Sequence, residues 1–126
     1  MFYYLLLVTS LPLVLSLIFD YFSQEKDKKE KKDKKEKLNI YLAGGWKFRA
    51  DIAPIKVQLE SKGYHVISHW MDRGRGVVTP DEFKDNANMD IEEVIESDIL
   101  VCIMTDSKYA YRDTFTEIGC ALGQNM

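Results

Sequence analysis

The feature that most constrains the fold is the run DILVCIM at residues 98–104, which is continuously apolar after its first residue. A strand that is apolar at consecutive positions is typical of the centre of a parallel sheet, where helices cover both faces. Parallel strands also need long crossover connections, which are usually helical. The run therefore predicts an α/β fold.

The residues upstream of this run fit the same plan. LNIYLAG at 38–44 predicts a strand that ends in a tight turn. A helix should follow, with Asp51 as its cap, Pro54 in its first turn and Gly63 at its end. YHVISHW at 64–70 predicts a second strand. Strand, helix and strand have the size of a parallel βαβ unit, about thirty residues.

A second helical connection leads to the central run. Thr79, Pro80 and Glu82 predict a capping box, which starts a helix that extends to Ser97, either unbroken or with a break near residues 86–88. The predicted connection has the length that a crossover to a parallel strand requires.

A final helix is predicted from about residue 114 onward, so the order of elements in residues 38–126 is β-α-β-α-β-α. This order is typical of a doubly wound parallel sheet. Three visible strands give a thin core, so we expect either marginal stability or completion of the sheet by another subunit, and hence a homo-oligomer.

The N-terminal part of the chain is of a different kind. Residues 2–19 carry no charge, and as a helix they would extend about 27 Å, close to the thickness of a hydrocarbon core. We therefore expect a hydrophobic helix over residues 1–20 that anchors the chain in a membrane. A cleaved signal peptide is the alternative, although the segment has neither a basic start nor a small-residue cleavage site.

A Lys- and Glu-rich linker at 21–37 follows. Residues 25–37 hold eight lysines and five acidic residues, which favours the cytoplasmic side of a membrane for this end and for the domain at 38–126. The lysines have two interpretations: contact with anionic lipid headgroups, or simple solvation of a linker.

The charge of the domain limits its partners. Residues 38–126 hold nine Lys or Arg and fourteen Asp or Glu, a net charge of −5. An acidic domain argues against binding to nucleic acid, whose affinity comes mainly from phosphate neutralisation. Cys102 and Cys120 lie in apolar runs without metal-ligand spacing, so we interpret them as reduced core residues.

Three groups of polar or small residues should meet at one edge of the predicted sheet. In open α/β sheets, ligands bind beyond the carboxyl ends of the strands. Tyr41, Gly44 and Gly45 lie at the end of the first strand. Asp90 lies on the helix before the third strand, and Glu117 lies on the helix after it. The sequence therefore predicts a pocket that holds two carboxylates and a tyrosine.

The stretches around these residues resemble a known family. YLAGG at 41–45, DIEEVIESDILV at 90–101 and TFTEIGCALG at 114–123 are similar, in this order, to the motifs of the nucleoside 2-deoxyribosyltransferase family, which includes 2′-deoxynucleoside 5′-monophosphate N-hydrolases. The resemblance covers residues 38–124. Family members generally continue into a further strand and helix, whereas this sequence ends at Met126, so we expect a C-terminally short member.

What the resemblance implies is a flavodoxin-like, Rossmann-like fold and an enzyme. The expected reaction is cleavage or transfer of the N-glycosidic bond of a 2′-deoxynucleoside or deoxynucleotide, with a nucleobase as the second partner and with no metal or organic cofactor. Transfer to a second base and hydrolysis by water both remain open, as does the presence of a 5′-phosphate on the substrate.

The resemblance also implies a role for each residue of the site. Glu117 matches the nucleophile that attacks the anomeric carbon and holds the deoxyribosyl group covalently. Asp90 matches the carboxylate that exchanges a proton with the base, and Tyr41 matches a tyrosine that orients the nucleophile. Gly44 and Gly45 match the loop at which the substrate approaches the backbone. Retaining glycosyl transfer needs this pair of groups, one aimed at carbon and one that exchanges a proton.

Further residues are candidates for substrate binding because of their positions. Trp70 ends the second strand, where a base could stack, although a packed core tryptophan fits equally well. Thr114 and Thr116 could receive a 5′-phosphate or 5′-hydroxyl at the start of the last helix, with Arg112 as a phosphate partner. Arg73, in the loop after the second strand, has either a substrate role or simple solvation.

Glu117 has a purely structural interpretation as well. Thr114 lies three positions before it, so the two residues could form a capping box that only starts the last helix. As a residue of a first helical turn, Glu117 should also be favoured in its ionised form by the helix macrodipole. For the whole chain, the alternatives to an enzyme are a non-catalytic nucleotide-binding module, a truncated and inactive family member, and a structural membrane protein.

Overall fold

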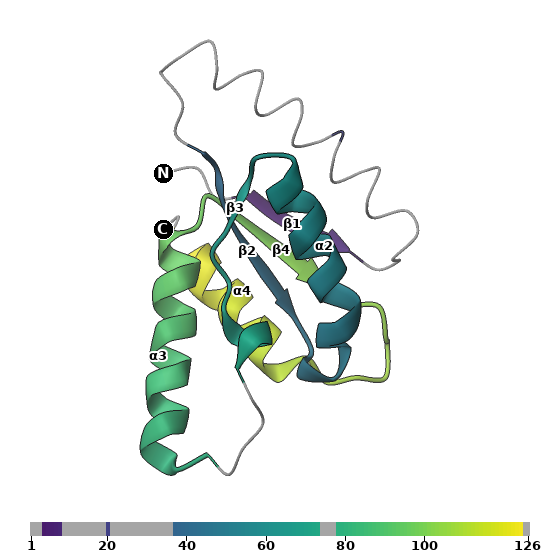
Figure 1. Ribbon diagram of the computed structural model, residues 1–126. Helices are drawn as coiled ribbons and strands as arrows, with labels where there is room; N and C mark the ends of the chain where they lie inside the picture. Colours follow the sequence, from purple (N-terminus) through teal and green to yellow (C-terminus); the bar gives the residue numbers. More distant parts are fainter. Residues whose placement is uncertain (1–3, 9–19, 21–36, 74–77, 125–126) are drawn as a thin grey trace.

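The computed structural model describes residues 4–8, 20, 37–73 and 78–124 (Figure 1). Its strands are β1 (Tyr4–Val8), β2 (Asn39–Gly44), β3 (His65–Val66) and β4 (Ile99–Ile103). They form one sheet in the order β1-β4-β2-β3, and every neighbouring pair is parallel. The helices are η1 (Trp46–Phe48), α2 (Arg49–Ser61), η2 (Trp70–Asp72), α3 (Pro80–Glu96) and α4 (Arg112–Gln124). The predicted α/β architecture is confirmed.

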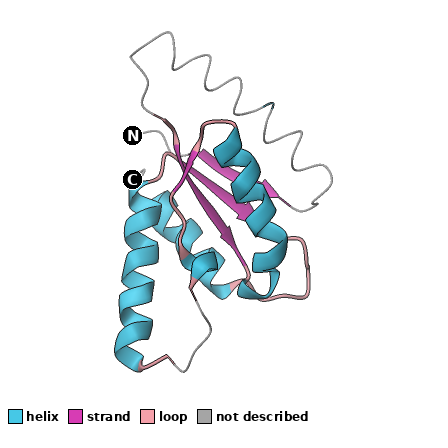
Figure 2. Ribbon diagram, viewed as in Figure 1, coloured by secondary structure: helices cyan, strands magenta, loops and turns pink. Residues whose placement is uncertain are grey.

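Helices lie on both faces of this sheet. The chain passes from β2 to β3 in one direction along the sheet and then returns past β2 to β4. Because parallel crossovers are right-handed, this reversal places α2 and α3 on opposite faces. α4 contacts α3 and so shares its face, as Figures 1 and 2 show.

The core is centred on the two middle strands. In β4 every residue is buried, and in β2 the four residues from Ile40 to Ala43 have no exposed surface. On α2, Ile52, Ile55 and Leu59 are buried as well. Each large aliphatic side chain buried in this way contributes about 1.5–3 kcal/mol to folding. The continuously apolar run of the sequence is therefore the central strand that it predicted.

The N-terminal segment differs from the expectation of a hydrophobic helix. Tyr4–Val8 is a strand, and it pairs in parallel with β4 from Tyr4 opposite Ile99 to Val8 opposite Ile103. Without β1, that edge of β4 would present unpaired backbone groups. An apolar extended segment satisfies these groups, which a helix could not do. β1 therefore adds a fourth strand to the three that the sequence predicts.

The remainder of the predicted anchor and most of the linker lie outside the described residues. No helix in the described ranges is both long enough and apolar enough to cross a membrane.

The second crossover helix agrees closely with its sequence pattern. The Thr79 hydroxyl accepts from the Glu82 backbone at 3.2 Å, and the Glu82 carboxylate accepts from the Thr79 backbone at 2.8 Å. Pro80 occupies the first turn, where its missing N–H leaves no helical bond unmade. α3 continues without a break through residues 86–88, because the asparagines there leave the helical hydrogen bonds intact.

Several predicted boundaries are wrong by a few residues. α2 begins at Arg49 after the single turn η1, so Asp51 is inside the helix rather than its cap, and Pro54 lies in the interior. β3 contains only His65 and Val66, since the chain turns into η2 soon afterwards. Gly63 does end the α2 segment, with a left-handed φ of 88°.

Candidate active site

Tyr41 and Glu117 meet although they are 76 residues apart along the chain. The Tyr41 hydroxyl, on β2, donates a hydrogen bond to Oε1 of Glu117, on α4, at 2.7 Å. Both side chains are buried, and Glu117 is 6% exposed. The sequence pattern predicts one pocket for these two residues, and the structure brings them into direct contact.

A cavity of about 350 Å³ lies beside this contact and contains the second carboxylate. Glu117 and Asp113 line it from α4, Asp90 lines it from α3, and Gly44 lines it from the end of β2. The cavity is therefore at the carboxyl end of the strands, as expected for a parallel sheet. Its volume is within the range of small-molecule sites.

Glu117 is held mainly in its neutral form. Burial raises its pKa to about 8, the hydrogen bond from Tyr41 partly offsets this rise, and the charges of Asp90, Asp113 and Glu93 add to it. α4 begins at Arg112, so Glu117 lies in the second turn and Thr114 is inside the helix rather than its cap. The capping-box alternative is therefore wrong. The expected ionisation by the helix macrodipole is also reversed, because desolvation outweighs it.

The groups packed around Glu117 stay protonated too. Burial and the nearby Glu117 charge raise the pKa of Tyr41 well above its ordinary value, so the phenol remains a donor. Burial raises the pKa of the Cys102 thiol to about 12, and Glu117 contributes to this shift. Cys102 is consequently an inert core residue rather than a nucleophile.

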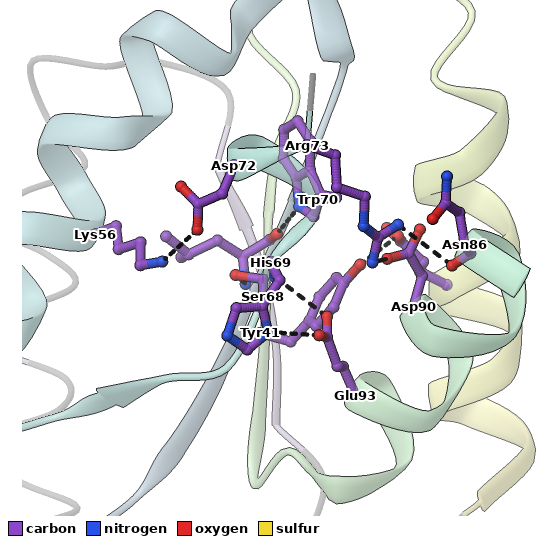
Figure 3. Close-up of polar contacts among 12 residues, drawn as sticks. Tyr41, Lys56, Ser68, His69, Trp70, Asp72, Arg73, Asn86, Asp90 and Glu93 are labelled. Atoms are coloured by element: carbon purple, nitrogen blue, oxygen red, sulfur yellow. Dashed lines mark hydrogen bonds and ion pairs between the residues drawn. The ribbon is translucent and has the colours of Figure 1, made fainter. Parts of the chain in front are cut away.

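Asp90 is in a different environment. Nη2 of Arg73 lies 2.7 Å from Oδ1 of Asp90, and Nη1 donates to the carbonyl oxygen of Asn86 at 3.3 Å (Figure 3). Burial raises the pKa of Asp90, and the hydrogen bond and charge of Arg73 partly offset that rise. From the sequence alone Arg73 has either a substrate role or simple solvation, although its position just beyond the second strand is a usable signal of a place in the site.

Two tryptophans form an aromatic wall of the cavity. Trp70 and Trp46 both line it, with ring centroids 6.4 Å apart. The Trp70 indole donates to the carbonyl oxygen of Leu42 at 2.7 Å, which fixes the ring at the end of β2. Trp46 was missed by sequence reasoning, though an aromatic residue directly after the strand-ending glycines could have indicated it. The guanidinium of Arg49 lies 4.6 Å from the Trp46 ring centroid.

Close packing within the protein favours glycine at Gly44, the last residue of β2, and at Gly45, which follows it. A Cβ atom at Gly44 would overlap Cδ1 of Ile52, and one at Gly45 would lie 2.6 Å from the Tyr109 ring. Gly44 also lines the cavity, whereas Gly45 is not among its described lining residues. Both positions therefore have a structural reason for glycine, and Gly44 adds room beside the site.

Of the residues predicted to bind substrate at the start of the last helix, some line the cavity and others do not. Thr116 lines the cavity, but its hydroxyl donates to the carbonyl oxygen of Arg112 at 3.1 Å. Thr114 is buried, and its hydroxyl has no hydrogen-bond partner among the described residues. Neither Thr114 nor the exposed Arg112 belongs to the described lining of the cavity.

In the described part of the chain, no group of three or more His, Cys, Asp or Glu residues is placed to hold a metal ion. In comparisons with known proteins, no family model, no curated protein and no solved structure matches the chain.

Proposed function

We propose that this protein cleaves or transfers the N-glycosidic bond of 2′-deoxynucleosides through a covalent deoxyribosyl intermediate on Glu117. The observation that carries the proposal is the convergence of Glu117 and Asp90 on one cavity, with the Tyr41 hydroxyl bound to Glu117. The resemblance of the three sequence motifs to the nucleoside 2-deoxyribosyltransferase family supports the same activity.

The strand order supports the flavodoxin-like assignment that belongs to this proposal. If β2 is counted as the first strand, β3 and β4 are the second and third, and the sheet reads 2-1-3 from its β3 edge. This is the beginning of the flavodoxin-like order 2-1-3-4-5. β1 then stands where a fourth strand would lie, although it comes from the N-terminal end of the chain.

Each residue has a defined step in the proposed reaction. A carboxylate oxygen of Glu117 attacks the anomeric carbon, the bond from that carbon to the base nitrogen breaks, and Asp90 gives its proton to the departing base. In the second half, an incoming base or water loses a proton to Asp90 and attacks the same carbon, which releases Glu117. Tyr41 keeps the nucleophilic oxygen in place and stabilises its charge by a hydrogen bond.

The walls of the cavity suit a flat heterocycle. Trp46, Trp70 and Phe83 line it, and aromatic faces bind nucleobases by stacking. Stacking is tolerant of base identity, because every base presents a π-face. We therefore expect both purine and pyrimidine deoxynucleosides to bind.

The charges of the cavity favour a substrate without a 5′-phosphate. Asp90, Asp113 and Glu117 line it, whereas Arg73 is the single basic residue among the described lining residues and is already bound to Asp90. A phosphate would have to enter beside these carboxylates, and no described lining residue offers a cation that is not already bound, which is electrostatically unfavourable. The predicted phosphate partner Arg112 is not among the described lining residues.

Mass spectrometry tests the proposal directly. Brief incubation with a deoxynucleoside should leave one deoxyribosyl group on Glu117, and addition of a different free base should give the exchanged nucleoside. Glu117→Gln should give neither, while Lys56→Gln, which breaks an ion pair with Asp72 outside the described lining of the cavity, should behave like the wild type. Absence of adduct, exchange and base release from folded wild type would reject the enzymatic proposal.

A non-catalytic nucleotide-binding module is the second candidate. The favouring observation is that both carboxylates are already engaged, Glu117 by Tyr41 and Asp90 by Arg73. Calorimetry distinguishes the two candidates: binding of a deoxynucleoside that is the same in wild type and Glu117→Gln, with no product formed, would favour the module.

Membrane attachment through residues 2–19, with the domain facing the cytoplasm, is a separate proposal. A transmembrane helix needs about 20 residues, so it would take up residues 4–8, which β1 uses in the sheet. The two uses exclude each other. Alkaline carbonate extraction of membranes from cells that express the full chain tests the anchor, and recovery of the protein in the supernatant would reject it without affecting the chemistry.

A further inference from the structure

Arg73 occupies a special position in the electrostatics of the cavity. Among the described residues that line it, Arg73 is the only basic one, and its side chain is 20% exposed. Its guanidinium bonds the Asn86 carbonyl and the Asp90 carboxylate, which both belong to α3, so it holds the Asp90 side chain in place (Figure 3).

Among the described residues, the other groups that face Asp90 are acidic or neutral. Glu93 lies on the same helix, Asp113 and Glu117 face it from α4, and Tyr41 faces it from β2. His69 does not act as a second counter-ion for Asp90, because its Nδ1 is 2.6 Å from Oε1 of Glu93. Arg73 is therefore the group that offsets the charge of an ionised Asp90.

Glu117 has no comparable cation among the described residues. Its hydrogen-bond partner is the neutral hydroxyl of Tyr41, and it is more deeply buried than Asp90, whose side chain is 23% exposed. Two neighbouring carboxylates in one cavity resist simultaneous ionisation, so one proton is retained by the pair. Burial beside the neutral Tyr41 hydroxyl favours that proton on Glu117, and the guanidinium contact favours the ionised form of Asp90.

We propose that Arg73 decides which of the two carboxylates holds this proton: while it binds Asp90 the proton stays on Glu117, and when its hydrogen bonds pass to another acceptor the proton moves to Asp90. The exchange breaks one O–H bond on Glu117 and forms one on Asp90, and the number of bound protons is unchanged. Arg73 is thus a positioning residue that acts through Asp90.

The consequence of this exchange rests on the proposed function. Glycosyl transfer requires an ionised Glu117 and a protonated Asp90, which is the reverse of the arrangement in the unliganded site. The carbonyl oxygens or ring nitrogens of a nucleobase in the cavity could accept the hydrogen bonds of Arg73, because a guanidinium has donors only and always needs an acceptor. Substrate binding would then convert the resting form into the reactive one.

A titration of the two carboxyl groups tests the proposal without any need for turnover. Carboxyl ¹³C shifts can be followed by NMR, with assignments from Asp90→Asn and Glu117→Gln. In the wild type, Glu117 should titrate at the higher pH, near its pKa of about 8. In Arg73→Gln, Asp90 should become the group that titrates at the higher pH, and the Glu117 midpoint should fall because its neighbour is then neutral. An unchanged order of the two midpoints in Arg73→Gln would overturn the proposal.

Two further variants separate the effect of the charge from that of folding. Arg73→Lys keeps the positive charge and should keep the wild-type order, with the same order expected in Lys56→Gln, which removes one positive charge outside the cavity. If Arg73→Gln did not fold, Arg73→Lys would serve as the test, because a lysine cannot bond the Asn86 carbonyl and the Asp90 carboxylate in the two-point manner of arginine. The proposal then requires that the titration midpoint of Asp90 be higher in Arg73→Lys than in Lys56→Gln.

Where turnover is measurable, the pH profile gives a second readout. The acidic limb of kcat/KM, which reports ionisation of Glu117, should move to lower pH in Arg73→Gln. A merely structural role for Arg73 would lower the rate and leave the limb in place, and that result would also overturn the proposal. An inactive wild type would reject the proposed function but leave the NMR titration valid.

Discussion

Asp90 and Glu117 line the same cavity, but the protein holds them by opposite means. Asp90 is partly exposed and paired with the Arg73 guanidinium, whereas Glu117 is buried and bonded to the neutral phenol of Tyr41. A charged partner favours an ionised carboxylate, and burial beside a neutral donor favours a protonated one. Two chemically equivalent groups therefore acquire different proton affinities from their neighbours alone.

This comparison shows how a site can be organised before a substrate arrives. When environments push the proton affinities of two carboxyl groups apart, the two groups are distinguished before a substrate binds, and here the resting order is the reverse of the one that the proposed reaction needs. The position of each group depends on a different element: Glu117 is fixed from β2 through Tyr41, and Asp90 from the segment after η2 through Arg73. Substitutions can therefore alter one group while leaving the other in place.

The largest expected effect is that of Glu117→Gln. Because Glu117 is mainly protonated at neutral pH, the amide replaces it with little change in charge or volume, and the fold should be retained. The variant lacks the proposed nucleophile, so single-turnover rates should fall by about 10⁴- to 10⁶-fold. Circular dichroism and thermal melting serve as the fold control. A folded variant that retained more than a tenth of the activity would show that Glu117 is not the nucleophile.

Asp90→Asn should have a smaller effect that depends on the leaving group. Loss of a general acid typically costs about 10²- to 10⁴-fold in rate. A deoxynucleoside whose base leaves as a stable anion needs no proton, so it should react with Asp90→Asn nearly as fast as with wild type, but not with Glu117→Gln. Equal losses for good and poor leaving groups in Asp90→Asn would contradict the assigned difference between the two carboxylates.

Tyr41→Phe should act through the ionisation of Glu117. The tyrosine hydrogen bond lowers the pKa of Glu117 against the effect of burial, so its removal should raise that pKa further above about 8. The ionised nucleophile is then rarer at neutral pH, and kcat/KM at pH 7 should fall by about 10- to 100-fold. Activity should recover as the pH rises, since the acidic limb moves to higher pH.

The control for this prediction is Tyr109→Phe, which removes a hydroxyl from the aromatic cluster beside η1 without touching Glu117. Its pH profile should match the wild type. A Tyr41→Phe profile that is lower at every pH, without a shifted limb, would mean that the tyrosine has only a packing role.

Much of the fold was accessible from the sequence because the decisive signals are local. The capping box at Thr79 and Glu82 fixes the start of α3 within a few residues, and the apolar run at 98–104 defines the central strand. β1 was not accessible in this way. Its residues are equally compatible with a membrane helix and a strand, and only the open edge of β4, which forms far along the chain, selects the strand.

Part of the site could also be predicted from the sequence. Tyr41, Asp90 and Glu117 could be placed at one sheet edge from the order of the elements and from the family resemblance. The protonation of Glu117 could not, because it depends on burial against several elements rather than on its place in a helix. The Arg73–Asp90 pair joins residues 17 positions apart in a loop and a helix, and no periodic pattern indicates such a contact.

The smallest expected effect concerns Asp113, the third carboxylate of the cavity. Asp113→Asn removes one negative charge, so it should raise the ratio of kcat/KM for a 5′-monophosphate to kcat/KM for the nucleoside by about three- to tenfold at low salt. Asp113 also raises the pKa of both Asp90 and Glu117, but this influence cancels in the ratio because the two substrates undergo the same chemistry. Asp51→Asn, on the exposed surface of α2, is the matched control with the same change in net charge. A ratio that is the same in both variants would mean that the charges of the cavity do not select against phosphate, and the preference for an unphosphorylated substrate would have to be abandoned while the roles of Asp90 and Glu117 stand.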